Sequence, residues 1–130
     1  MLRTPLLALA LALPALPALA AEYGPAAIRP IAPIEGSFAV EFRVSGADPF
    51  RYVVCLAAAE VAAHHGAELT FLLRADFGAM ETGGGHAGSV PIRVTDEVEG
   101  GPVPEEEMAG TILAGCAAEN IPTDAERLVD

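Results

Sequence analysis

The chain has no lysine, and its seven basic residues, all arginine, stand against eighteen acidic residues. The formal charge of −11 argues against nucleic acid and anionic membrane surfaces as partners, because both would repel the protein. Cations and basic proteins remain open as partners. The glycine-rich segment 82–89 also lacks the lysine of a phosphate-binding P-loop and precedes a strand, so we interpret it as a flexible connection.

The chain also lacks an apolar run long enough to span a bilayer. Residues 1–20 begin with Arg3, continue with leucine and alanine, and are interrupted by Pro14 and Pro17. They end in Ala-Leu-Ala, a pattern typical of signal-peptide cleavage, so we expect the mature chain to start at Ala21. The residues after this point include no cysteine for lipid attachment, so we expect a soluble exported protein without a transmembrane segment. The alanine-, glycine- and arginine-rich usage is typical of GC-rich bacteria, which makes the periplasm the expected compartment, with secretion as the alternative.

Two patterns predict the central elements. Residues 37–45 alternate apolar and polar side chains, which indicates a strand with one buried face. Residues 48–66 predict a helix that Asp48 caps, Pro49 begins and Gly66 ends. Residues 67–74 predict a second strand, so we expect a βαβ unit whose two strands are parallel neighbours.

The other segments carry weaker signals. Pro91 predicts that the strand 89–95 lies at the edge of the sheet, because proline cannot donate to a ladder. The remaining predictions are a proline-rich linker or strap (21–36), two loops (75–89 and 96–104), a second helix (105–120) and a C-terminal tail (122–130). The expected fold is an α+β domain over 37–121, of order β-α-β-β-α, with two helices on one face of a small three-stranded sheet. The free edges of such a sheet predict a possible protein partner or homodimer.

Only two cysteines are present, and no C-x-x-C motif. Cys55 and Cys116 lie on the apolar or small-residue faces of the two predicted helices, so in an oxidising compartment they predict a disulfide. The alternatives are two buried thiols or a redox-active pair. The second is disfavoured because neither cysteine begins a helix, where the dipole would lower its pKa.

Glu60, His64 and His86 are the candidate metal ligands, because carboxylate and imidazole bind zinc and copper. The competing interpretation is structural. Histidine is favoured at the C-terminus of a helix by the dipole, and Glu60 and His64 form an ordinary i,i+4 pair. No cofactor is expected under this second interpretation.

Catalytic signals are absent as well. None of Ser37, Ser45 and Ser89 lies in a G-x-S-x-G nucleophile elbow, and no two acids are marked as a pair. We therefore predict no catalytic residue and no enzyme activity.

Residues 38–46, FAVEFRVSG, and 52–74, YVVCLAAAEVAAHHGAELTFLLR, resemble a loose group of small bacterial envelope proteins, several of them lipoproteins. In that group a helix of the type A-A-E-x-A-x-x-x-G leads directly into a strand of the type Y-x-x-F. This chain departs from the lipoprotein members because it lacks the lipidated cysteine. The resemblance implies an envelope location and no known catalysis, and it assigns no site residues.

The function expected from these observations is that of a non-enzymatic accessory or binding domain, periplasmic or secreted. The alternative is a periplasmic metal-binding protein that uses Glu60, His64 and His86.

Overall fold

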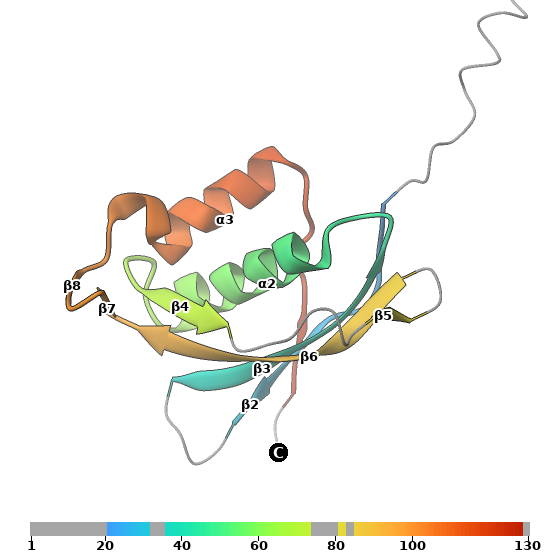
Figure 1. Ribbon diagram of the computed structural model, residues 1–130, viewed down its shortest axis with the longest axis horizontal. Coiled ribbons are helices and arrows are strands. Elements are labelled where there is room, and N and C mark those ends of the chain that lie inside the picture. The colour runs from blue at the N-terminus through green and yellow to red at the C-terminus, as the bar shows by residue number, and fades with distance from the viewer. Residues whose placement is uncertain (1–20, 32–35, 74–80, 83–84, 129–130) are drawn as a thin grey trace, which may run out of the picture.

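The computed structural model describes residues 21–31, 36–73, 81–82 and 85–128, of which 81, 82, 85 and 86 are described for the backbone only. The predicted signal peptide, 1–20, lies outside the described residues. The fold is α+β, as predicted: one mixed sheet has two helices on the same face (Figure 1). Within the described part of the chain, no helix has the length and apolar character needed to cross a membrane.

The central strand is β3 (Ser37–Ser45), with the bounds that the alternation predicts. The four side chains on its helix-covered face are all buried: Phe38, Val40, Phe42 and Val44. Because side chains alternate along a strand, Ala39, Glu41 and Arg43 point to the opposite face. Among the described residues, no helix covers that opposite face, which we call the open sheet face (Figure 1).

The first helix, α2 (Pro49–His64), forms as predicted. The carboxylate of Asp48 accepts a hydrogen bond of 2.9 Å from the amide of Phe50. At the other end, the amides of His65 and Gly66 both donate to the carbonyl of Val61. The ring of His65 stacks on Phe38, with 6.1 Å between centroids. The helix therefore runs back along β3, from one end of the strand to the other.

The predicted neighbouring pair of parallel strands is wrong in one respect. β4 (Thr70–Leu73) is parallel to β3, but β6 (Gly85–Thr95) lies between them and pairs antiparallel with both. The edge position expected from Pro91 is also wrong, since Pro91 lies opposite Ala39 in the middle of the sheet. The described register of β4 runs from Thr70, opposite Thr95, to Leu73, opposite Ile92.

The sheet has more than the three strands expected, because both flanking segments join it. β1 (Glu22–Tyr23) and β2 (Ala27–Pro30) pair with β3 where a linker or strap was predicted. In the predicted tail, β9 (Glu126–Arg127) pairs parallel with β2. The resulting order is β4-β6-β3-β2-β9, with β1 on β3 and β5 (Glu81–Thr82) on β6. The predicted loop after β6 contains the short hairpin of β7 (Glu97–Val98) and β8 (Gly101–Pro102).

The second helical segment is divided in two, unlike the single helix predicted over 105–120. A short 3-10 helix, η3 (Glu105–Glu107), is followed by an extended Met108 and then by α3 (Ala109–Ala118). The first amides of α3 donate to the segment before β4, from Ala109 to Leu69 and from Gly110 to Ala67. A Cβ on Gly110 would lie 3.1 Å from that of Ala67, so glycine permits this approach. These contacts fix where α3 begins.

Tyr52 connects the N-terminal segment to the core. Its side chain on α2 is 2% exposed, and its hydroxyl donates to the carbonyl of Gly24 at 3.1 Å. Its ring lies edge-on to Tyr23, with centroids 4.9 Å apart. Burial raises the pKa of the Tyr52 phenol, and the charges of Tyr23 and Asp124 add to this effect.

This raised pKa predicts an alkaline loss of stability. Below the unfolded pKa of 10.0 the phenol is neutral in both states; above it, the unfolded chain ionises first and is favoured. We expect the free energy of unfolding to fall as the pH rises above about 10, and to fall less in Tyr52→Phe. Urea unfolding at pH 8 to 11 measures both. An equal decline in the two proteins would contradict the assignment to Tyr52.

Candidate functional site

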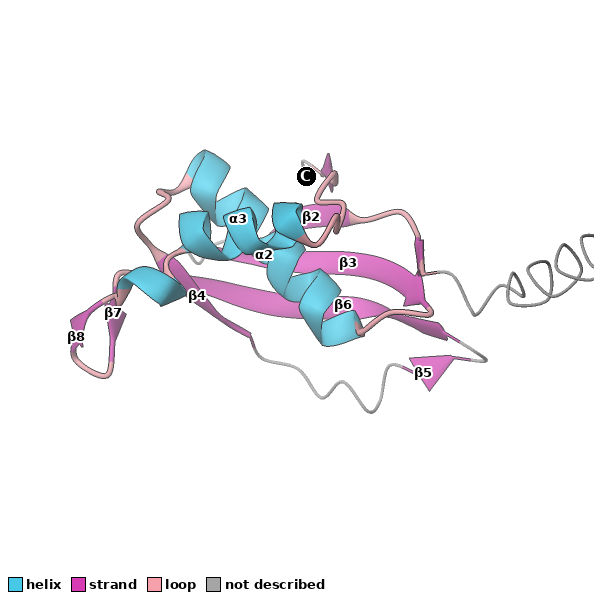
Figure 2. Ribbon diagram, turned by 90° about the horizontal axis from the view of Figure 1, so that it is seen from above, coloured by secondary structure: helices cyan, strands magenta, loops and turns pink. Residues whose placement is uncertain are grey.

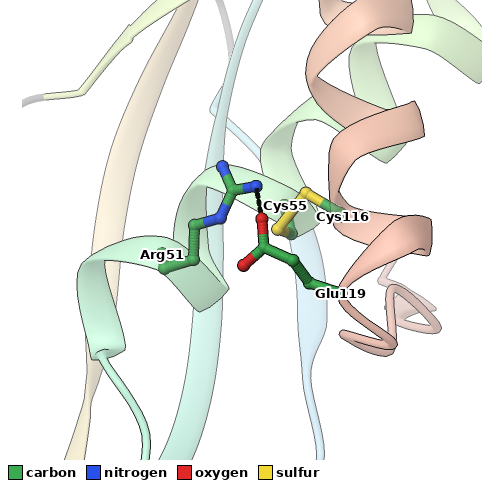
Figure 3. Close-up of a disulfide and its surroundings, with 4 residues drawn as sticks. All are labelled: Arg51, Cys55, Cys116 and Glu119. Carbon is green, nitrogen blue, oxygen red and sulfur yellow. Dashed lines mark hydrogen bonds and ion pairs between the residues drawn. A yellow bond between two sulfur atoms is a disulfide. The ribbon is translucent and has the colours of Figure 1, made fainter.

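The predicted disulfide is present between Cys55 on α2 and Cys116 on α3 (Figure 3). The two Cα atoms are 5.9 Å apart, and both residues are fully buried, at 0% exposure. Thiol–disulfide exchange needs access for an attacking thiolate, which this burial denies. The bond therefore acts as a covalent link between the two helices.

A surface ion pair crosses the same helix interface. Arg51 lies one turn before Cys55, and Glu119 follows Cys116 at the end of α3 (Figure 3). The guanidinium donates to the Glu119 carboxylate at 2.6 Å. Because both side chains are solvent-exposed, this pair contributes at most about 1 kcal/mol.

Glu60 is a buried carboxylate on α2, with 6% of its side chain exposed. Arg127 on β9 satisfies it with two hydrogen bonds, of 3.2 Å from Nε and 3.0 Å from Nη2. The Nε2 atom of His64 lies 3.9 Å from the same carboxylate. The i,i+4 pair predicted from the sequence is thus present, but its acid is held mainly by an arginine that is distant in sequence.

The predicted metal site is brought together only in part. Glu60 and His64 are neighbours, but Glu60 already accepts two bonds from Arg127. The backbone of His86 lies opposite Val44, near the end of β3 that leads into the start of α2, whereas His64 lies in the last turn of α2. The ring of His86 lies outside the described side chains, so zinc or copper binding stays a prediction. Among the described residues, no three histidine, cysteine or acidic side chains are placed to hold a metal ion.

A groove of about 240 Å³ separates α2 from the C-terminal segment. Its charged or titratable groups are Glu60, His64, Asp124 and Arg127. Apolar side chains form much of the remaining lining: Ile28, Leu56, Ala59, Ala63 and Ala125. The Glu60–Arg127 pair crosses this groove and fastens the C-terminal strand to the helix.

The open sheet face carries a second group of charges, which sequence reasoning missed. Three exposed arginines point to it: Arg29 from β2, Arg43 from β3 and Arg93 from β6. Arg29 is paired with Glu41 at 2.7 Å on the same face. Arg43 and Arg93 make no ion pair among the side chains that the structure describes. The alternation within β3 and β6 assigns Arg43 and Arg93 to polar faces, whereas Arg29 lies in a segment without alternation, and only the strand order shows that the three residues share one surface.

An open hollow of about 560 Å³ lies on this surface. Polar side chains from three strands line it: Glu41 and Arg43 on β3, Ser89 on β6 and Glu126 on β9. The backbone at Gly88 and the small side chains of Ala27 and Ala87 contribute to the same hollow. Its chemistry is that of a guanidinium and a hydroxyl beside two carboxylates.

No protein-family model matches the chain, and searches of curated proteins and of solved structures return no match either.

The disulfide predicts a large stability difference. The double variant Cys55→Ala/Cys116→Ala removes a link between residues 61 apart in sequence. In the chain-entropy model its free energy of unfolding falls by roughly 4 kcal/mol, whereas Arg51→Ala changes it by less than about 1 kcal/mol. Denaturant titration of the oxidised chain and both variants measures this. A loss as small as that of Arg51→Ala would show that the link does not support the fold.

Loss of the Glu60–Arg127 pair is predicted to let the C-terminal strand β9 open locally. The amides of Glu126 and Leu128 donate to Ala26 and Ile28, so their hydrogen exchange reports whether β9 is docked. In Glu60→Gln we expect both amides to exchange about fivefold faster, because a charged partner of Arg127 is lost. Glu41→Gln removes the other strand-linked ion pair and is the control, with unchanged exchange at these amides. Equal exchange in the unsubstituted protein and both variants would show that the Glu60–Arg127 pair does not hold β9 in place.

Proposed function

We infer that this chain is an exported, non-enzymatic binding domain that contacts its partner through the open sheet face. The observation that carries this proposal is the one-sided cover of the sheet: both described helices lie over one face (Figure 2), and Arg29, Arg43 and Arg93 lie on the other. A four-stranded surface built from β2, β3, β6 and β4 is broad and held by backbone hydrogen bonds. Such a surface keeps its shape without the partner.

Export is supported by the disulfide, since such bonds persist in oxidising compartments such as the periplasm. A small domain buries little apolar surface, and α3 buries only Ala109 and Cys116 fully. A covalent link between the helices stabilises a fold of this size without a cofactor. The absence of a catalytic motif supports binding over chemistry.

Site-specific photo-crosslinking in the native envelope tests the proposal. A crosslinking residue placed at Ser89, exposed on the open sheet face, should form a covalent adduct with another protein. The matched control is Ala114, exposed on α3. We expect adducts from position 89 and few from position 114. Equal yields from both positions, or none from either, would count against the open sheet face as the contact surface.

A further inference from the structure

The arginines without an ion-pair partner are not spread evenly over the described surface. Five arginines have described side chains, and three of them are bound to carboxylates: Arg29 to Glu41, Arg51 to Glu119 and Arg127 to Glu60. Arg43 and Arg93 have no ion-pair partner among the described side chains. Both point to the open sheet face. In a chain with eighteen acidic residues, the two unpaired described arginines thus share one surface.

We propose that the open sheet face binds a short acidic segment of a partner protein, with Arg43 and Arg93 as its two anchoring cations. This inference rests on the proposed function and names the chemistry of its partner. Guanidinium groups favour carboxylates, because their planar donors can form two parallel hydrogen bonds to one carboxylate.

The register of the sheet gives the length of the segment. Arg43 lies opposite Ala87 on β6, and Arg93 lies further along the same strand. At about 3.3 Å per residue, the two backbone positions are separated by about 20 Å along the strand direction. An extended peptide covers this distance with about six residues. Carboxylates at both ends of such a segment can therefore meet both arginines.

The hollow beside Arg43 provides a further donor. Ser89 lines it with Arg43, and the glycine at 88 leaves the backbone uncovered. A carboxylate bound at Arg43 has the Ser89 hydroxyl on the neighbouring strand as a second donor. Glu41 and Glu126 line the same hollow, and Glu41 is paired with Arg29. These two acids limit how many negative charges fit in the hollow beside Arg43.

The overall charge of the protein favours a short acidic segment, rather than an extended anionic surface, as the binding partner. The formal charge of −11 repels a bilayer or a nucleic acid that reaches beyond the open sheet face. Screening limits this repulsion to about 8 Å at physiological ionic strength. A segment of about six residues lies between the two arginines and covers less of the acidic surface than a bilayer or a nucleic acid does.

Titration with octaglutamate tests the proposal. The probe is added to the oxidised, ¹⁵N-labelled exported chain, and backbone amide shifts are followed by NMR. We expect saturable shifts at residues 41–43 and 87–93 that weaken as salt is raised. In the Arg43→Gln/Arg93→Gln double variant Kd should rise about fourfold, since each exposed ion pair changes an affinity by a factor of about two.

Arg51→Gln is the control, because it removes one positive charge from the helix-covered side and should leave Kd unchanged. Circular dichroism verifies that each variant is folded. The inference is overturned if all variants bind octaglutamate equally, or if Arg51→Gln weakens binding as much as the double variant. It is also overturned if phosphatidylglycerol-containing vesicles bind with the same arginine dependence and octaglutamate does not.

The two proposals fail separately. A crosslink from position 89 together with no response to octaglutamate would overturn the acidic segment and leave the open sheet face as the contact surface. No crosslink from position 89 would count against the proposed function itself, whatever the titration gives.

Discussion

The covalent link between Cys55 and Cys116 is the constraint on which the arrangement of the two helices depends. α3 is short, and its first amides are bound by the segment before β4. At its other end the disulfide and the Arg51–Glu119 pair fix it to α2. Two points of attachment determine the position and direction of a helix, so α3 needs few apolar contacts of its own. Because both helices lie on one face, no helix in the described part of the chain covers the other face of the sheet.

The local elements were readable from the sequence, whereas their assembly was not. Strict alternation gave β3 its bounds, and Asp48 with Pro49 marked the start of α2, because caps and period-two patterns are local signals. The insertion of β6 between β3 and β4 was not predicted, since a βαβ pattern specifies direction and not adjacency. Pro91 suggested an edge, but it lies in β6, which pairs with β3 on one side and with β4 on the other. The short strands β1, β2 and β9 carry no pattern of their own: β1 and β2 form on the edge of β3, and β9 forms on the outer edge of β2.

The candidate site was likewise predictable from the sequence only in its local features. The disulfide followed from two cysteines on two inward helix faces, and the structure confirms it. The Glu60–His64 pair was visible as an i,i+4 spacing, but Arg127, which satisfies most of that carboxylate, comes from the far end of the chain. Arg43 and Arg93 each alternate with apolar residues in their own strands, a pattern that does not relate one strand to the other. Their common surface emerges only from the antiparallel pairing of β3 with β6.

The parallel pairing of β2 with β9 has a consequence for the order in which this domain is completed. During synthesis the N-terminus emerges first, so β2 is exposed early and β9 becomes available only after almost the whole domain has been made. During that interval the outer edge of β2 offers unpaired backbone groups to any neighbouring chain, which is the usual route to edge-to-edge aggregation. Pro30 at the end of β2 and the exposed Arg29 beside it are residues of the kind that discourage such pairing. The outer edge of β2, which β9 covers last, thus carries residues that disfavour pairing with another chain before β9 is in place.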